Sequence, residues 1–231
     1  MNRRAFTALA ACGFGLPVLP RSSRASEPEV APGATGKPGT GTLSTAEIVS
    51  RVEARYEKVG TFEARFKQQS YLLPAERGTT GRVIFEKPSK MSWRYASTGN
   101  RIVSDGVRIQ VYERESQRLY DQELAASLYP LALSFLSAPG KLSSNFRLAE
   151  QQPITPKGVH VLVAEPLRAS AACASLTLDV DVRSYEVRRV RIRDAQGNRH
   201  GFAFVAPQLN TRVPRGEFTF SPPPHTQIIR L

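Results

Sequence analysis

Much of this chain is a long series of short segments in which apolar and polar residues alternate, a pattern that permits few folds. After Gly60, for example, Phe62, Ala64 and Phe66 are each separated by one charged residue. A period of two residues places successive side chains on opposite faces of an extended strand, so each segment is typical of a strand with one buried face. About ten to twelve strands are expected, at residues 61–70, 79–86, 90–97, 100–105, 107–114, 117–123, 145–151, 159–165, 174–183, 186–194, 199–206 and 215–220.

Turn signals join these segments at short intervals. Asp105-Gly106 lies between two apolar stretches and favours a two-residue hairpin, and the tetrapeptide 195–198 separates another pair. Such short connections join antiparallel neighbours, so the strands are expected to form a meander. A sheet of this size must close into a barrel, fold into a sandwich or cover its apolar face with helices.

Two segments have the period of a helix instead. Ser44 and Glu47 have the spacing of a capping box, an apolar stripe follows, and Gly60 favours a stop, so residues 44–59 are expected to form one amphipathic helix. Proline in the first turn is compatible with a second helix at residues 127–137. The apolar face of that helix carries Leu128, Leu131, Phe135 and Leu136.

The N-terminal segment has the pattern of an export signal. Residues 1–25 combine a charged start, a short apolar run and a small-residue cleavage site, which is typical of a secretory signal peptide. The general secretory route and a twin-arginine route both fit. In a rival interpretation, Cys12 ends a lipobox and is lipidated, which would tether the protein to a membrane instead of leaving it soluble.

The charge of the chain needs an explanation that agrees with export. Lys and Arg number 32 against 20 Asp and Glu, a formal net charge of +12. Residues 26–42, rich in Pro and Gly, are expected to be a disordered linker before one folded domain at residues 43–231. Residues 1–42 hold five basic and two acidic residues, so the domain keeps +9. Basicity is typical of nucleic-acid binding, but export removes that partner.

Residues that could carry chemistry are few and scattered. The three histidines and two cysteines lack the spacing of metal ligands, and no nucleotide-binding or nucleophile motif is present. Asp179 and Asp181 share the outward face of one strand, and we interpret them as solvated polar residues and not as an acid/base pair. Cys173 is interpreted as a structural thiol. We therefore expect no catalytic residue, metal or cofactor, and expect binding through apolar surface.

A basic strand face is a second candidate for binding. Arg189, Arg191 and Arg193 alternate with Val190 and Ile192. The two interpretations are a solvated face and a docking surface for an anionic membrane or an acidic partner.

Motifs in a characteristic order extend across residues 44–229. They are Phe62-x-Ala64-x-Phe66-x-Gln68, Lys87-Pro88-Ser-Lys-Met91-Ser-Trp93-Arg-Tyr95, Ile102-Val-Ser-Asp105-Gly106, Asp194-x-x-Gly197, Asn210 and Phe218-Thr-Phe220-Ser-Pro222-Pro223. Together they resemble the outer-membrane lipoprotein carrier protein (LolA) family. The resemblance implies a mainly β fold with a few helices, an unclosed antiparallel β half-barrel covered by lid helices.

The resemblance also implies a function. A family member is a periplasmic chaperone that takes the acyl chains of lipoproteins from an inner-membrane ABC transporter to an outer-membrane lipoprotein receptor, and we expect a monomer. The rival functions are an outer-membrane-anchored lipoprotein receptor, which requires lipidated Cys12, and a periplasmic lipid-sensing regulatory module of the same fold.

Site residues follow from the same resemblance. The acyl-chain cavity is expected to be lined by Phe66, Met91, Trp93, Tyr95, Ile109, Val111, Leu176, Leu178 and Phe204. The lid is expected to contribute Leu128, Leu131, Phe135 and Leu136. Lys87 stands where some family members have an arginine that ties the lid to the sheet. Ordinary core packing is the alternative for each apolar residue, since a dry core and a ligand cavity have the same pattern.

Overall fold

A computed structural model of the chain describes residues 43–72, 75–126, 141–152, 158–169 and 172–231. The expected signal peptide, linker and second helix, with Leu128, Leu131, Phe135 and Leu136, lie outside the described residues. In the part of the chain that the structure describes, no helix is both long and apolar enough to cross a membrane.

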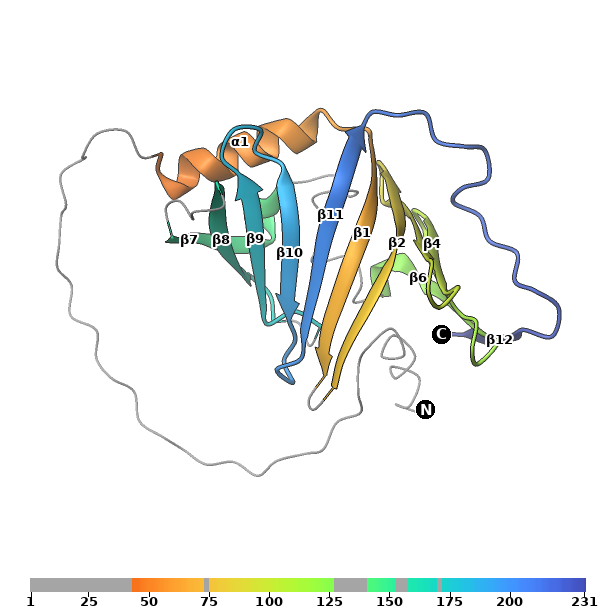
Figure 1. Cartoon of the computed structure of the whole chain (residues 1–231). Helices are drawn as coiled ribbons and strands as arrows, with labels where there is room; N and C mark the ends of the chain where they lie inside the picture. The colour runs from red at the N-terminus through yellow and green to blue at the C-terminus, as the bar shows by residue number, and fades with distance from the viewer. Residues whose placement is uncertain (1–42, 73–74, 127–140, 153–157, 170–171) are drawn as a thin grey trace, which may run out of the picture.

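The described elements are one α-helix, twelve strands and two short 3₁₀ turns (Figure 1). Helix α1 is Thr45–Glu57, and the 3₁₀ turns are η2 at Leu124–Ala126 and η4 at Leu142–Ser144. The strands are β1 Thr61–Leu72, β2 Ala75–Glu86, β3 Lys90–Tyr95, β4 Arg101–Asp105, β5 Arg108–Glu113, β6 Arg118–Glu123, β7 Phe146–Gln152, β8 Val159–Pro166, β9 Ser175–Asp181, β10 Val187–Arg193, β11 Arg199–Leu209 and β12 Gln227–Arg230.

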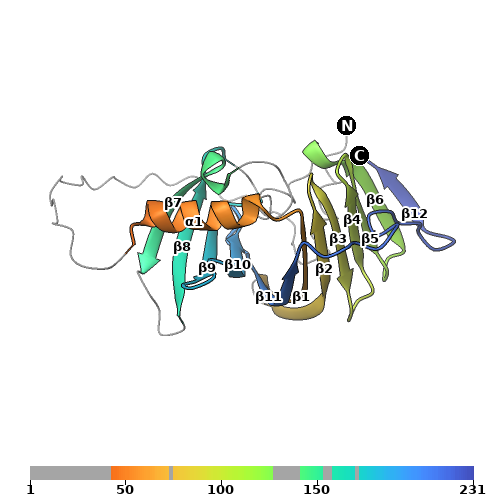
Figure 2. The ribbon, with the colours of Figure 1, turned by 90° about the horizontal axis from the view of Figure 1, so that it is seen from above.

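All twelve strands belong to one sheet, in the order β12-β6-β5-β4-β3-β2-β1-β11-β10-β9-β8-β7. Most strands that follow one another in the chain pair antiparallel, and the two halves meet where β1 pairs with β11. The edge strands are β12 and β7, so the sheet is unclosed. Figure 2 shows it from above as an open trough that bends at β1 and β11. The expectation of a mainly β, unclosed half-barrel is confirmed.

One expected strand is wrong. Residues 215–220 alternate in polarity but form turns and irregular chain, and the last strand is β12, which pairs parallel with β6. The alternation arises because the segment lies across the outer face of the sheet. Glu217 is buried there, and the rings of Phe218 and Phe220 lie 5.7 Å from Lys90 Nζ and 5.4 Å from the Arg101 guanidinium carbon. Contact with side chains of the sheet, and not strand pairing, produces the pattern.

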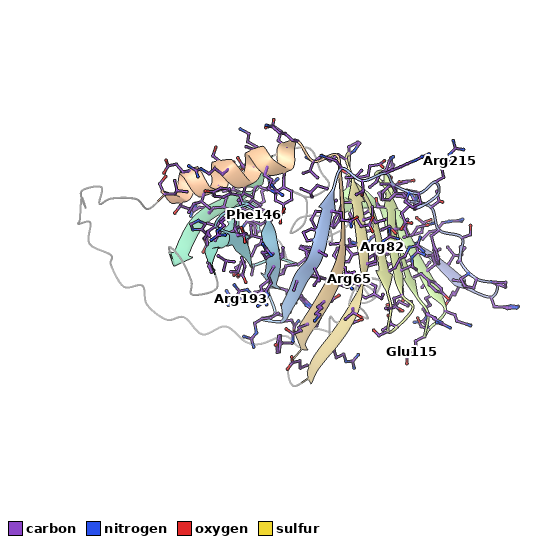
Figure 3. The ribbon with its side chains drawn as sticks, turned by 45° about the horizontal axis from the view of Figure 1, so that its top comes forward. Arg65, Arg82, Glu115, Phe146, Arg193 and Arg215 are labelled. Carbon is purple, nitrogen blue, oxygen red and sulfur yellow. The ribbon has the colours of Figure 1, made fainter. Side chains whose placement is uncertain are left out.

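Helix α1 begins as its sequence predicts. The Ser44 Oγ accepts a hydrogen bond from the Glu47 amide at 3.3 Å, and the Glu47 Oε2 accepts one from the Ser44 amide at 2.8 Å, which completes the capping box. Its buried residues are Ile48, Val49, Val52 and Tyr56. The helix crosses one end of the trough over β7–β10 (Figures 1 and 2), with Phe146 of β7 beneath it (Figure 3).

Candidate functional site

A large part of the concave face of the trough is an apolar wall. All nine residues predicted to line the cavity are at most 6% exposed and belong to a single hydrophobic cluster. They come from five strands because each strand contributes one alternate face, and the register of the sheet aligns these faces. The predicted residues are Phe66, Met91, Trp93, Tyr95, Ile109, Val111, Leu176, Leu178 and Phe204.

Aromatic rings form the centre of this wall. Trp93 is fully buried, and its ring centroid lies 5.0 Å from Phe66, 5.6 Å from Phe85 and 5.4 Å from Phe202, each in an edge-on arrangement. Such pairs contribute about 0.5–1.5 kcal/mol each beyond the burial of their area. The rings therefore hold one another in place in the present conformation, and any ligand on the wall must exchange with these contacts.

Phe85 and Phe202 were missing from the predicted site. They are identified by the residues opposite them on β1. Phe85 of β2 pairs with Phe62, and Phe202 of β11 pairs with Gln68. Directly paired residues of adjacent strands share a face. Both phenylalanines therefore line the trough, but the pairing is known only once the register is known.

Lys87 joins the sheet to helix α1. Its Nζ donates a hydrogen bond to the Tyr56 carbonyl oxygen at 2.6 Å, in the last turn of the helix. Burial lowers the pKa of Lys87, and the nearby Glu57 carboxylate opposes that shift. A cation at a helix C-terminus also interacts favourably with the helix dipole. The residue predicted to close a lid at 127–137 thus ties the described helix α1 to the turn between β2 and β3.

The same end of α1 is held by the other half of the trough. The Tyr56 hydroxyl accepts a hydrogen bond from the Val187 amide at 3.0 Å, and burial raises the pKa of Tyr56 to about 12. Arg55 forms an ion pair with Glu186. Because β3 and β10 lie on opposite sides of the bend, the end of α1 bridges both sides and limits how far the trough can open at this end.

The side chains considered for chemistry are engaged in ion pairs or buried. Asp179 and Asp181 lie on the outer face as predicted, but they pair with arginines: Asp179 with Arg191 at 2.5 Å and Asp181 with Arg188 at 2.8 Å. Cys173 is buried, which raises its pKa to about 11. Across the described residues, His, Cys, Asp and Glu side chains form no group of three or more that could hold a metal ion.

A family model and known proteins of similar sequence relate this chain to the same kind of protein. A family model described as "Outer membrane lipoprotein carrier protein LolA" matches residues 57–221. The chain is similar to the outer-membrane lipoprotein carrier protein of Cupriavidus pinatubonensis, with 24% identity over 189 residues that cover 81% of this chain and 87% of that protein. It is similar to that of Bordetella avium, with 27% identity over 204 residues, 82% of this chain and 93% of that protein.

The fold also occurs among solved structures. An uncharacterized conserved protein from Thermus thermophilus superposes with a TM-score of 0.52 at 15% sequence identity, over 80% of this chain and 98% of that one. At this identity the similarity concerns the fold alone.

Proposed function

The chain belongs to the LolA family of outer membrane lipoprotein carrier proteins, and on that premise we propose that it is a periplasmic chaperone for lipoproteins. It binds their acyl chains in the trough, receives them from an inner-membrane ABC transporter and delivers them to an outer-membrane receptor. The family is one of carriers and not of enzymes.

The observation that carries this proposal is the apolar wall of the unclosed sheet. Each acyl CH₂ removed from water contributes about 0.8 kcal/mol, so a lipid-anchored protein cannot cross an aqueous compartment without an apolar host. The aligned apolar faces of the strands offer that host, and the open edges at β7 and β12 mean that the wall is not sealed into a barrel.

Transfer by such a carrier is an exchange of apolar contacts. The sequence contains no nucleotide-binding motif that could drive release. Acyl chains therefore leave when a receptor offers an equal or better apolar site. The mutual packing of Phe66, Trp93 and Phe202 competes with the acyl chains, which keeps the net affinity moderate and release possible.

Trp93 allows a direct test because it is the single tryptophan of the chain. Bromine atoms on an acyl chain quench tryptophan fluorescence on contact. We expect a peptide with a brominated acyl chain to quench Trp93 in a saturable way, while the same peptide without the chain leaves the fluorescence unchanged. Saturable binding of the acylated peptide without quenching would place the acyl chain away from this wall.

The cellular role is tested by depletion in the native host. When the protein is depleted, we expect outer-membrane lipoproteins to accumulate in the inner membrane. Fractionation of the host's membranes measures this. Normal delivery would overturn the carrier role.

The intact mass of the mature protein tests location: a chain that starts near Ser26 is soluble in the periplasm, whereas lipidated Cys12 would make it an anchored receptor.

A further inference from the structure

The concave face is not apolar along its whole length. On β1 the residues that face the trough are Phe62, Ala64 and Phe66, followed by Gln68 and Ser70. The apolar part lies toward helix α1, and the polar part lies toward the turn between β1 and β2. All five side chains are buried, so the change in polarity takes place inside the molecule and not at its solvent surface.

The neighbouring strands change in the same direction. Across the register, Phe66 pairs with Phe204 of β11, whereas Ser70 pairs with His200 of that strand. On the other side of β1, Gln68 pairs with Thr79 of β2. Three adjacent strands thus place apolar residues at one end of the concave face and polar residues at the other.

Gln68, Ser70 and His200 form a connected group, called here the polar end of the trough. The Gln68 Nε2 donates a hydrogen bond to the Ser70 Oγ at 3.2 Å, and that Oγ lies 3.1 Å from the His200 Nδ1. The three residues are 4%, 3% and 2% exposed. Burial lowers the pKa of His200, and the nearby Asp194 opposes that shift.

One acceptor in this group is unsatisfied. The Gln68 Oε1 is buried and has no hydrogen-bond partner among the residues that the structure describes. A buried polar atom without a partner is costly, and an apolar residue at the same position would avoid that cost. The wall beside Gln68 is apolar: Phe202, the directly paired residue on β11, is one of the rings around Trp93.

We propose that the polar end binds the amide that joins an acyl chain to the polypeptide of the cargo, with the Gln68 Oε1 accepting the hydrogen bond of the amide N–H. This inference rests on the proposed function. An acylated peptide is apolar along its chain and polar where the chain meets the peptide, and the concave face has the same two parts in the same order. The cargo therefore lies with its chain ends toward α1 and its junction toward the β1–β2 turn.

The test compares two ligands that differ in one donor. One is a peptide with an amide-linked palmitoyl chain, and the other is its analogue with an N-methylated amide, which lacks the N–H. Binding is followed by the fluorescence of Trp93. We expect the wild-type protein to prefer the N–H ligand by about 5- to 10-fold, the range of a single hydrogen bond.

The variant Gln68→Leu removes the acceptor, and Gln69→Leu is its matched control, because Gln69 is the next residue of β1 and is exposed on the outer face. We expect Gln68→Leu to bind both ligands equally and Gln69→Leu to keep the preference. Gln68→Met, with the same chain length, guards against a packing defect, and each variant is checked for an unchanged thermal transition.

The outcomes separate the two proposals. A preference that persists in Gln68→Leu and Gln68→Met, or that is absent from the wild-type protein although both ligands bind, overturns the amide site and leaves acyl-chain binding intact. Failure of the wild-type protein to bind either ligand overturns the proposed function and the amide site together.

Discussion

On the outer face of the sheet, two glutamates offset a row of positive charges. Four arginines occupy directly opposite positions on adjacent strands, and like charges in such positions destabilise a sheet. This arginine row consists of Arg65, Arg82, Arg94 and Arg101, of which Arg65 and Arg82 are labelled in Figure 3. Glu63 pairs with Arg82 at 2.8 Å, and Glu217 pairs with Arg94 through two hydrogen bonds of 3.0 and 2.7 Å.

Glu217 is the stronger anchor of the two glutamates because it is buried and also accepts a hydrogen bond from the Ser92 hydroxyl at 2.7 Å. We expect Glu217→Gln to destabilise the protein by about 2 kcal/mol, since it weakens charge-assisted hydrogen bonds and leaves Arg94 and Arg101 less compensated. Chemical denaturation measures the loss. The matched control, Glu115→Gln at an exposed site, should change stability little.

The same residue should make stability depend on pH. Burial raises the pKa of Glu217, but hydrogen bonds from Arg94 and Ser92 outweigh burial and hold it below the ordinary 4.5. A folded-state pKa below the unfolded value stabilises the protein above the unfolded pKa, and this contribution disappears as pH falls through the folded pKa. We expect the stability difference between wild type and Glu217→Gln to shrink below pH 4.5. A difference that stays constant down to acid unfolding would contradict the assignment.

At the scale of elements, α1 acts as a bridge between the two sides of the trough. Lys87 holds its last turn from the β2–β3 side and Val187 holds it from β10, both through Tyr56. The first turn depends on the capping box of Ser44 and Glu47. The first and last turns of the helix are therefore held by different contacts.

We expect Lys87→Met to weaken the attachment of α1 selectively, because it deletes the hydrogen bond to the Tyr56 carbonyl but keeps the apolar stem of the side chain. Hydrogen exchange should become faster for α1 amides than for those of β1 and β11, and acyl-chain exchange should become faster as well. Lys67→Met, at an exposed outer position of β1, is the control. Equal acceleration in all elements would indicate general destabilisation instead.

For the whole molecule, the positive charge is a cost that the fold tolerates. The formal charge is +12 over the chain, and a large net charge destabilises a compact state through self-repulsion. The outer face of β10 carries three further arginines, Arg189, Arg191 and Arg193, and all three are exposed. Asp179, on the neighbouring strand β9, forms an ion pair with Arg191 and lies close to Arg189.

Salt should therefore stabilise this protein. Raising NaCl from about 0.05 to about 0.5 M shortens the screening length and weakens repulsion among exposed cations. We expect the thermal midpoint to rise by a few degrees, measured by calorimetry at constant pH. A fall in the midpoint would mean that attractive ion pairs such as Arg82–Glu63 contribute more than the repulsion.

Most elements could be predicted because their signals are local. The capping box placed the start of α1, Asp105-Gly106 placed a hairpin, and the alternation at Phe62, Ala64 and Phe66 identified a buried strand face. The same local rule was wrong at residues 215–220, since alternation records which side chains are buried and not what buries them.

Most strands, their buried faces and the family follow from the sequence alone, because a period of two and a helix cap depend on residues a few positions apart. Which buried faces meet depends on the folded sheet. Ser70 and His200 lie 130 residues apart, yet they pair across β1 and β11 and join Gln68 at the polar end of the trough. A one-residue change of register would move Gln68 and Ser70 to the outer face. Register is set by packing across the whole sheet, so it cannot be read from any one segment.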